Sequence, residues 1–497
     1  MQYPIWEPFL ANSLIIAIVA ILHVFVSHFA IGGGLYLVLA EIWARRKNDE
    51  AHLGYVKKHS RFFALTTLVF GAVSGVGIWV TIGLIHPTGT KWLINNFVWG
   101  WATEWVFFFI EITAAMVYYY GWKRLSAKTH IAIGWIYFIA AWLSLVVING
   151  ILTFMLTPGE WLTTGNFWDG FFNPSYIAST LFRTCICLML AGLYALITIA
   201  KEKNEEFKIK IMRRNGWFII IPLLLAIPTG LWYYNVLPES VTGAFLPGMV
   251  PTIALQVMIF SAGLLLLLSV LGTLVFPRNT GYVSAAILML LGLMVMGGFE
   301  WAREAARKPY IIYDFLYSNN VLKSNEANLP AEKPIPIKYT SGDRGRDLYL
   351  AGCRSCHTLD GYNSLGEQLA GLEIEHIAGI IPRLQHFIGK MPPFPGNEKD
   401  AADLAEFLAS HVFPDPVSTR ADLTESEKNK IVFDRRCGGC HTLNGFREIG
   451  STFNDLGYDE SEEFVLMVQE LTDEMPAFTG DENELKMLIA YLREGAK

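Results

Sequence analysis

Two cysteine pairs in the last third of the 497-residue chain are each followed directly by a histidine. The two motifs read Cys353-Arg-Ser-Cys356-His357 and Cys437-Gly-Gly-Cys440-His441. In the pattern C-x-x-C-H, the two thiols bond to the edge of a porphyrin and the adjacent histidine binds the iron. Two occurrences in one chain predict two covalently bound haem c groups, with His357 and His441 as axial ligands.

A methionine lies 34 residues after each of these histidines. Met391 begins the sequence Met-Pro-Pro-Phe, and Met475 begins the sequence Met-Pro-Ala-Phe. A methionine opposite the histidine raises the reduction potential of a haem, which suits electron transfer. We therefore predict Met391 as the second ligand of the first haem and Met475 as the second ligand of the other.

The two motifs belong to an internal repeat with an offset of 84 residues. The same offset relates Phe407 to Tyr491, and each copy resembles a small class I cytochrome c with an opening helix, a methionine loop and a closing helix. We expect one cytochrome c domain at residues 341–416 and a second at residues 417–497. A zinc site is the alternative for each cysteine pair, but neither has a second cysteine pair to complete it.

The rest of the chain is rich in apolar residues, which make up 53 % of the whole sequence against 17 % charged residues. A membrane-spanning helix needs about 20 apolar residues. Eight candidate spans lie at about 11–40, 63–86, 100–121, 131–156, 177–200, 217–236, 250–276 and 281–301. The sequence predicts an all-α protein, in which this helix bundle precedes the two small helical domains.

Lysine and arginine are distributed unevenly between the loops of the predicted bundle. The loops on one side hold sixteen of these residues, and those on the other side hold only Lys91. The positive-inside rule then places the N-terminus and the haem domains on the periplasmic side of a bacterial inner membrane. Residues 341–497 carry an excess of 13 acidic residues, and nothing in the charge pattern indicates nucleic-acid binding. Residues 311–340 are expected to form an extended linker.

Several ionisable residues lie within the predicted spans, where charged groups are costly and therefore indicate function. The first span contains His23 and His28, five residues apart and hence on different faces. The third contains Glu104 and Glu111, seven apart and hence on one face. The fifth contains Arg183, and the outer end of the eighth contains Glu300, Arg303, Glu304 and Arg307.

Short sequences in three spans resemble subunit I of cytochrome bd oxidases. They are Phe107-Phe-Phe-Ile-Glu111 with Gly121-Trp-Lys-Arg-Leu125, then Phe172-Asn-Pro174, then Glu304-Ala-Ala-Arg307-Lys-Pro-Tyr310. The resemblance covers about residues 10–310 and implies a bd-like transmembrane domain at 1–310. That family reduces oxygen at a paired high-spin haem site near the outer surface, beside a second related membrane subunit. The resemblance therefore implies a partner subunit and one or two membrane haems.

By position in this family, His23 is similar to the ligand of the oxygen-reactive haem, which is haem d or a second haem b. Glu304 is similar to the ligand of the neighbouring high-spin haem b, and Arg307 to the arginine that meets haem propionates. Glu104 and Glu111 are similar to the proton-path and haem-side carboxylates. Two alternatives stay open, namely that His23 is a hydrogen-bonded core residue and that Glu304 pairs with Arg303 or Arg307.

The sequence also departs from the family at two places. The family's low-spin haem takes a histidine nine residues after the proline of the Asn-Pro sequence, and this position is Arg183 here. The long quinol-binding loop between spans six and seven is reduced to about residues 237–249. The low-spin haem and the quinol site are therefore expected to be lost together, with the two c-type haems as the replacement entrance for electrons.

Three functions are compatible with the sequence. The first is a bd-like terminal oxidase subunit that takes electrons from a periplasmic cytochrome through two c-type haems to a membrane haem site that reduces oxygen. The second is an electron-transfer or anchor subunit that exchanges electrons between periplasmic cytochromes and quinone without oxygen reduction. The third is a membrane tether for two cytochrome domains. The acidic tail suits electrostatic steering of a basic donor protein.

Overall fold

The computed structural model describes residues 12–494 apart from residues 248, 330–331, 338–339, 389–390, 445–446 and 473. The chain divides into two compact units. One unit comprises Ile16–Arg307 and the other contains the chain from Lys308 onward. Both units are helical, and one two-stranded hairpin is found in the described part of the second unit.

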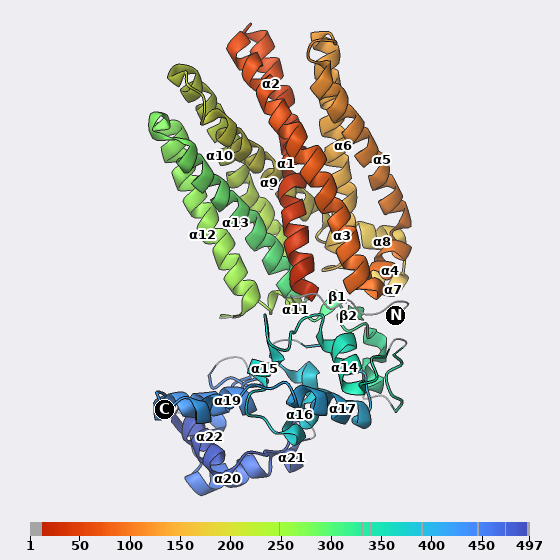
Figure 1. Ribbon diagram of the computed structural model, residues 1–497, viewed down its shortest axis with the longest axis vertical. Coiled ribbons are helices and arrows are strands. Elements are labelled where there is room, and N and C mark those ends of the chain that lie inside the picture. The colour runs from red at the N-terminus through yellow and green to blue at the C-terminus, as the bar shows by residue number, and fades with distance from the viewer. Residues whose placement is uncertain are drawn as a thin grey trace. The chain divides into compact units, whose positions relative to one another are not determined.

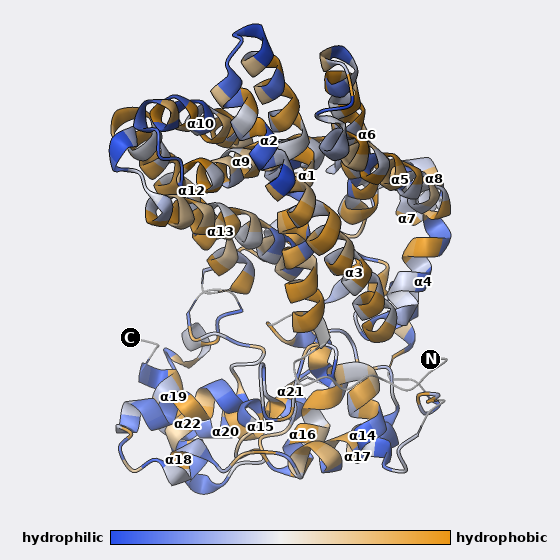
Figure 2. Ribbon diagram, turned by 45° about the horizontal axis from the view of Figure 1, so that its top comes forward, coloured by the Kyte–Doolittle hydropathy of each residue, from blue (hydrophilic) through white to orange (hydrophobic). Residues whose placement is uncertain are grey.

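The first unit is a bundle of long helices (Figure 1). Eight described helices are long and apolar enough to cross a membrane, which confirms the predicted number of spans. They are α1 (Asn12–Arg46); α2 (Glu50–Ala64) with η1 (Leu65–Gly71) and α3 (Ala72–Ile85); α5 (Val98–Gly121); α6 (Ala127–Phe154); α9 (Tyr176–Ile199); α10 (Glu205–Asn235); α12 (Val250–Ser269) with η2 (Val270–Val275); and α13 (Tyr282–Arg307). Figure 2 shows apolar residues along most of their length.

Two of these helices begin well before the apolar run that predicted them. Helix α2 begins at Glu50 rather than near residue 63, and α10 begins at Glu205 rather than near residue 217. Asp49 accepts a hydrogen bond from the His52 amide and caps α2, while Asn204 caps α10 in the same way. The added turns are charged because they extend beyond the apolar part of a membrane, so hydropathy alone does not detect them.

Helix α9 lies at the centre of the bundle. A Cβ atom on Gly32 of α1 would overlap the backbone carbonyl of Cys187, and one on Gly292 of α13 would overlap the side chain of Leu193. Gly192 allows α10 an equally close approach, because a Cβ atom there would lie 2.9 Å from the carbonyl oxygen of Asn215. Small residues at these crossings let helix backbones pack closely in a membrane. Arg183 is therefore carried by the helix with the most neighbours.

Short elements connect the spans. They are α4 (Pro87–Asn96), α7 (Trp161–Thr164), α8 (Phe167–Phe171), α11 (Glu239–Thr242) and η3 (Pro277–Asn279). Asn173, between α8 and α9, donates hydrogen bonds to the carbonyl oxygens of Gly150 and Gly170 at 3.1 and 3.0 Å. This amide therefore joins the end of α6 to the start of α9, just before the turn that positions Arg183.

The second unit begins with a folded segment where the sequence predicted an extended linker. Strands β1 (Tyr310–Ile312) and β2 (Leu316–Tyr317) pair antiparallel, and η4 (Lys323–Asn328) follows. Ile312 and Leu316 are fully buried, so apolar side chains within the segment fold it back on itself. Further along, Ile335 packs against the first haem domain and its amide donates to Asp400 at 2.7 Å.

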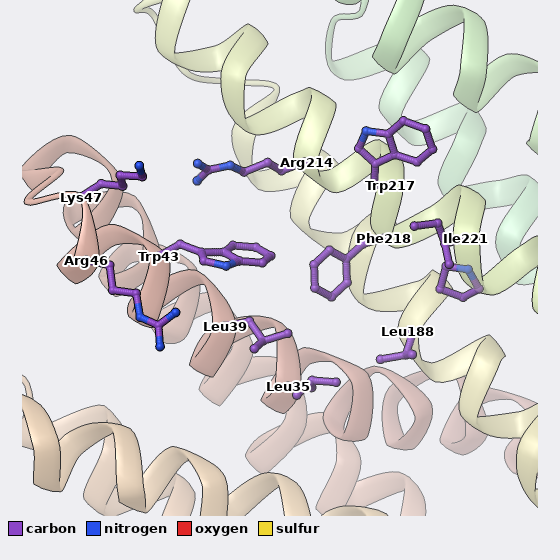
Figure 3. A pocket seen from close by; sticks show the side chains of 11 residues that line it. Leu35, Leu39, Trp43, Arg46, Lys47, Leu188, Arg214, Trp217, Phe218 and Ile221 are labelled. Atoms are coloured by element: carbon purple, nitrogen blue, oxygen red, sulfur yellow. The ribbon is translucent and has the colours of Figure 1, made fainter.

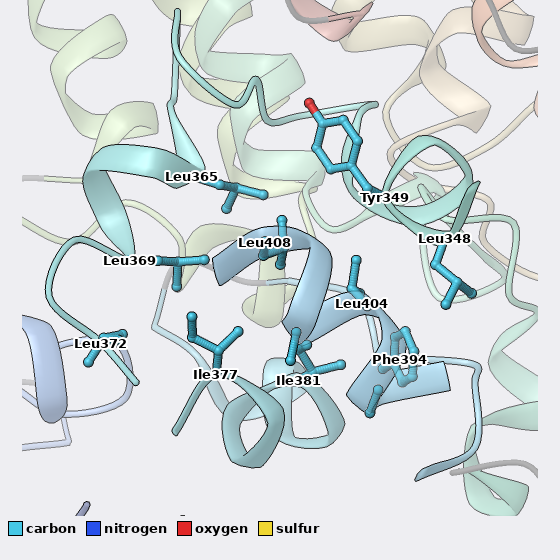
Figure 4. Close-up of a cluster of buried hydrophobic side chains, with 12 residues drawn as sticks. Leu348, Tyr349, Leu365, Leu369, Leu372, Ile377, Ile381, Phe394, Leu404 and Leu408 are labelled. Carbon is cyan, nitrogen blue, oxygen red and sulfur yellow. The ribbon is translucent and has the colours of Figure 1, made fainter. Parts of the chain in front are cut away.

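Residues 341–416 form a small helical domain, here called module 1. It contains α14 (Arg344–Leu348), η5 (Tyr349–Cys353), α15 (Leu365–Gln368), α16 (Ile374–Ile380), η6 (Ile381–His386) and α17 (Glu398–Ala409). Its core gathers Leu348, Leu369, Ile377, Leu404 and their neighbours (Figure 4). Gly345 lets α14 cross α17 closely, since a Cβ atom there would overlap the carbonyl oxygen of Asp403.

Residues 417–497 form a second cluster of helices, here called module 2. Helix α18 (Pro416–Thr419) lies at its start. The other elements of module 2 are α19 (Glu425–Arg436), η7 (Gly450–Phe453), α20 (Tyr458–Leu466), α21 (Val468–Leu471) and α22 (Glu482–Glu494). A capping box formed by Thr424 and Glu427 begins α19. Val432, Phe453, Leu488 and Ile489 are buried in its own core, so each module buries a separate set of apolar side chains.

Candidate functional site

Both cysteine motifs form the same tight turn. In module 1 the amides of Cys356 and His357 donate to the carbonyl oxygen of Cys353 at 3.0 and 2.9 Å. In module 2 the amides of Cys440 and His441 donate to Cys437 at 3.1 and 2.9 Å. No disulfide joins these four cysteines, and burial raises the pKa of Cys353 and of Cys437 to about 12. Each turn presents two thiols and an imidazole together.

The two histidines are oriented by equivalent backbone groups. The Nδ1 atom of His357 lies 3.2 Å from the carbonyl oxygen of Asn363, and that of His441 lies 3.4 Å from the carbonyl oxygen of Arg447. Asn363 and Arg447 are 84 residues apart, and both have positive φ angles, of 55° and 52°. Because a carbonyl only accepts, Nδ1 carries the proton and Nε2 keeps its lone pair for a metal. Both sites therefore fit an iron ligand.

The repeat extends to the helices that support each turn. Tyr349 packs against Phe407 with ring centroids 5.7 Å apart, and Phe433 packs against Tyr491 at 5.1 Å. The Tyr349 hydroxyl also donates to the carbonyl oxygen of His357 at 3.1 Å. Met391 and Met475 both lie partly buried in segments without regular secondary structure. The 84-residue repeat read from the sequence is thus a repeat of contacts.

A charged contact that the sequence did not reveal joins the two modules. Arg436 of module 2 donates to both carboxylate oxygens of Glu373 in module 1, at 2.7 and 2.9 Å. Burial acts to raise the pKa of Glu373, but the hydrogen bonds and charge of Arg436 outweigh it and lower the pKa to about 2. Arg435 pairs with Asp415 at 2.8 Å. The pair of arginines next to Cys437 therefore holds module 1.

A backbone contact joins the segment before Met391 in module 1 to the second cysteine motif in module 2. The amide of Ile388, three residues before Met391, donates to the carbonyl oxygen of Gly439 at 2.7 Å. Gly439 lies inside the second cysteine motif, and its backbone packs against the ring of Phe387. The segment that leads to the predicted ligand of one haem therefore contacts the attachment turn of the other.

In the membrane bundle, the charged end of α13 includes a residue from α9. Arg183 Nη1 lies 2.6 Å from Glu300 Oε1, and Arg303 Nε lies 3.1 Å from Glu300 Oε2. Arg303 also pairs with Glu304 at 2.6 Å, and Arg307 pairs with the other oxygen of Glu304. These residues form one chain of ion pairs that is buried except at Glu304, whose side chain is 35 % exposed. The sequence predicted the crowding at the end of α13 but not the participation of Arg183.

Several donors of this cluster are buried without a hydrogen-bond partner in the described part of the chain. They are Nε and Nη2 of Arg183 and Nη1 of Arg303. A guanidinium has no lone pair to offer a metal, so Arg183 does not fit the ligand of the family's low-spin haem. Its remaining donors do fit a carboxylate, because paired N–H groups bind such anions well.

His23 and His28 face different helices. His23 Nδ1 lies 3.2 Å from Ser74 Oγ on α3, whereas His28 Nε2 lies 3.5 Å from Arg183 Nη1 on α9. The Ser74 hydroxyl donates to the carbonyl oxygen of Phe70 at 2.7 Å, so it accepts a hydrogen from His23 Nδ1. His23 Nε2 then keeps the lone pair that an iron ligand needs.

Glu104 and Glu111 both accept hydrogen bonds from hydroxyl groups on α6. The sequence analysis did not identify these hydroxyl groups. Ser144 donates to Glu104 at 3.0 Å, and Tyr137 donates to Glu111 at 3.0 Å. One heptad further along α5, Tyr118 donates to the fully buried Glu41 of α1 at 2.8 Å. His130, Tyr137 and Ser144 are spaced by seven on α6, as Glu104, Glu111 and Tyr118 are on α5. This matched spacing on the two helices was the sequence signal that could have identified Tyr137 and Ser144.

His130 completes the polar contacts at the basic end of these helices. Its Nδ1 atom lies 2.8 Å from Glu41 Oε2, and Arg45 pairs with the other oxygen of Glu41 at 2.7 Å. Polar pairs thus occur at three levels of the α5–α6 contact, while Val38 and the Tyr118 ring pack closely at Gly134 between two of them.

Comparisons with known proteins agree with this division of the chain. The family model for cytochrome bd terminal oxidase subunit I matches residues 13–240. The family model for the cbb3-type cytochrome c oxidase subunit III matches residues 340–408. No curated protein matches the chain.

Among solved structures, the chain is similar to the bd oxidase from Geobacillus thermodenitrificans. The TM-score is 0.53 at 16 % sequence identity, and the match covers 61 % of this chain and 88 % of that one. The first unit therefore has a bd oxidase-like membrane fold, followed by a helical cytochrome c-like region. The chain is an integral membrane protein of respiratory electron transfer that binds haem, with c-type haem in module 1.

Proposed function

We propose that the chain is a terminal oxidase subunit that receives electrons at two c-type haems and reduces oxygen at membrane haems. The observation that carries this proposal is the buried pair of Arg183 and Glu300, 2.6 Å apart. By the resemblance to bd oxidase subunit I, Arg183 stands at the position of the histidine that holds the family's low-spin haem. A chain that retains a bd-like bundle without this ligand needs another electron entrance, and the two cysteine motifs supply one.

The residues of module 1 and module 2 have the same role in this proposal. The four cysteines would hold the two haems, and His357, Met391, His441 and Met475 would bind their irons. Haem iron, when bound, supplies one-electron chemistry in the modules and oxygen chemistry in the membrane. The Ile388–Gly439 contact and the Arg436–Glu373 pair hold the two attachment sites in a fixed arrangement.

In the membrane, His23 would hold the oxygen-reactive haem, and Ser74 fixes the tautomer of the His23 imidazole. Arg183, Arg303 and Arg307 bind carboxylates at the outer end of α13. Oxygen reduction consumes protons, and Glu111 with Tyr137 and Glu104 with Ser144 relay them along α5 and α6.

The proposal also covers the membrane in which the chain lies and the proteins with which it interacts. The uneven distribution of lysine and arginine supports a bacterial inner membrane, with both modules on the periplasmic side. A second bd-like membrane subunit and a periplasmic cytochrome are the proposed partners. The acidic surface of the modules favours a basic donor, because opposite charges accelerate encounter.

One observation favours a second candidate function, in which electrons pass between periplasmic cytochromes and quinone without oxygen reduction. Both oxygens of Glu304 are paired with arginines, Oε1 with Arg303 and Oε2 with Arg307. A carboxylate neutralised in this way is a weaker iron ligand, so the site would hold one membrane haem fewer. A quinone and not oxygen would then be the second redox partner.

Oxygen uptake by the purified full-length protein separates the two candidates. Under the first, reduced soluble cytochrome c drives oxygen uptake, and pyridine haemochrome analysis finds two c-type haems plus membrane haem. His23→Ala should abolish uptake and remove membrane haem while keeping both c-type haems. His59→Gln is the control variant, because His59 is another histidine of the same bundle, buried and bonded to Thr198. Quinol-dependent reduction of the c haems without oxygen uptake would instead support the second candidate.

A further inference from the structure

A groove between α1 and α10 has two chemically different ends (Figure 3). Its volume is about 610 Å³. Leu35, Leu39, Trp43, Arg46 and Lys47 line it from α1; Arg214, Trp217, Phe218, Ile221 and Pro222 line it from α10; and Leu188 of α9 completes it. The three cationic side chains gather at one end, and the aliphatic side chains occupy the other.

The length of the groove corresponds to the depth of one lipid leaflet. Leu35 and Lys47 are twelve residues apart on α1, which is about 18 Å along a helix at 1.5 Å per residue. Half of a bilayer's hydrocarbon core is about 15 Å. A chain that enters beside Lys47 and follows the helix therefore reaches the middle of the membrane near Leu35.

The cationic end of the groove carries charge that the protein does not neutralise. Arg46 and Lys47 are exposed, and neither has a carboxylate partner among the described residues. Arg214 lies 3.1 Å from His52 Nδ1 and stacks over Trp43 at 5.5 Å. Neighbouring basic residues differ, because Arg45 pairs with Glu41 and Lys210 pairs with Asp49. Three positive charges thus face the mouth of the groove together.

Contacts between α1 and α10 fix the two walls of the groove relative to each other. The Tyr36 hydroxyl donates to Asn215 Oδ1 at 2.9 Å, and its ring packs against Phe218 at 5.2 Å. The indoles of Trp43 and Trp217 line the groove near the charged end, and Trp217 is 51 % exposed. Tryptophan is enriched at the level of lipid headgroups. The groove is thus preformed, with an interfacial belt at its charged end.

We propose that this groove binds one anionic phospholipid. Its phosphate is held by Arg46, Lys47 and Arg214, and an acyl chain lies along Leu39, Leu35 and Leu188. Basic pockets between spans on the cytoplasmic side recognise such headgroups. A zwitterionic lipid brings its own cation to this cluster, and a quinone brings no charge to neutralise it. The charge of the site therefore selects the anionic lipid.

Native mass spectrometry of the delipidated full-length protein tests this site with added phosphatidylglycerol and phosphatidylcholine. We expect the first lipid to bind at least tenfold more tightly. The double variant R46Q/K47Q should lose that preference. The matched variant K57Q/K58Q should keep it, because Lys57 and Lys58 are exposed basic residues of α2 that do not line the groove. Equal loss in both variants would mean non-specific attraction and would overturn the proposal.

A groove-filling variant tests the proposed contact with the acyl chain separately from the contribution of the cationic side chains. Leu39→Trp should weaken phosphatidylglycerol binding at least tenfold with all three cations present, and its unfolding temperature checks that it is folded. Inorganic phosphate should not displace the lipid at millimolar concentration. The proposal is wrong if phosphate alone displaces it, if the two lipids bind equally, or if a quinone or a second polypeptide is retained in the groove instead.

Discussion

Arg183 of the membrane bundle and Arg436 of the second unit are both about 1 % exposed, and each binds a glutamate. The two glutamates differ. The side chain of Glu300 is 7 % exposed, whereas that of Glu373 is 40 % exposed. Both members of the first pair are therefore removed from water, while the second pair keeps one member hydrated. Two similar hydrogen-bonding patterns thus have different energetic consequences.

The partners that remain for each arginine differ as well. Arg436 also pairs with Glu484, lies 3.1 Å from Thr479 Oγ1 and stacks over Phe478 at 5.5 Å, which leaves only its Nε without a partner. Arg183 keeps both Nε and Nη2 without a partner among the described residues. An arginine whose hydrogen-bond donors nearly all have partners suits a structural clamp between the modules. An arginine with spare buried donors suits a site that binds a further anion.

The largest effect is expected from removing Glu300, because both members of the Arg183–Glu300 pair are buried. Glu300→Ala leaves Arg183 charged and without its carboxylate, and breaking a buried pair in this way costs about 3–5 kcal/mol. We expect a lower yield of protein in the membrane and a lower unfolding temperature. Tryptophan fluorescence measures the unfolding temperature. In the rescue variant R183M/E300L, apolar side chains replace both charges and should recover most of the loss. Failure of the rescue would assign Glu300 a role beyond this pair.

What the sequence predicted well depends on spacing along one element. Heptad spacing placed Glu104 and Glu111 on one face of α5, and both bond to α6. The 84-residue repeat anticipated equivalent contacts at Asn363 and Arg447, although neither residue was singled out. The eight spans follow from apolar length alone. Each of these features is set by local geometry, which a sequence records directly.

What the sequence did not predict depends on contacts between elements. The partner of Arg183 lies 117 residues away on α13, and the partner of Arg436 lies in the other module. Tyr137 and His130 were overlooked because their carboxylate partners sit on α5 and α1. The order and the tilt of helices decide such pairs, and no periodicity within one helix encodes them. The predicted haem ligands remain predictions for the same reason.

A pH-dependent effect should appear at the clamp between the modules. Burial, together with the charge of Arg436, lowers the pKa of His376 to about 4, so the folded state holds this imidazole neutral. The unfolded chain takes up the proton near pH 6.5. Stability is therefore complete above pH 6.5 and falls as the pH drops toward 4, by about 3 kcal/mol from this group.

Circular dichroism of the full-length protein in detergent between pH 7 and 2 measures this loss. Glu373 adds a second decline between its ordinary pKa of 4.5 and its folded value of about 2, because its carboxylate is stabilised by Arg436 only when ionised. His376→Gln should remove the first decline and leave the second. An unchanged profile in this variant would contradict the assignment to His376.

A smaller effect is expected from breaking the clamp itself. Arg436→Met removes the hydrogen bonds to Glu373, but both carboxylates left behind are partly exposed and become hydrated. The expected cost is about 2 kcal/mol, the net value of one hydrogen bond between charged groups, because water replaces the others. Hydrogen exchange should accelerate in residues 373–380 and 475–479, where the modules meet. Haem c content should stay unchanged, which distinguishes a loosened interface from a misfolded module 2.

The smallest effect is expected where both members of an arginine pair are mostly exposed. Arg420 and Asp422 lie 2.8 Å apart, with side chains 57 % and 68 % exposed. Water solvates both groups once the pair is broken, and exposed pairs contribute little for that reason. Arg420→Met should therefore leave the unfolding temperature and the hydrogen exchange of module 2 unchanged. A loss as large as that of Arg436→Met would show that charge, and not burial, sets the order of these three arginines.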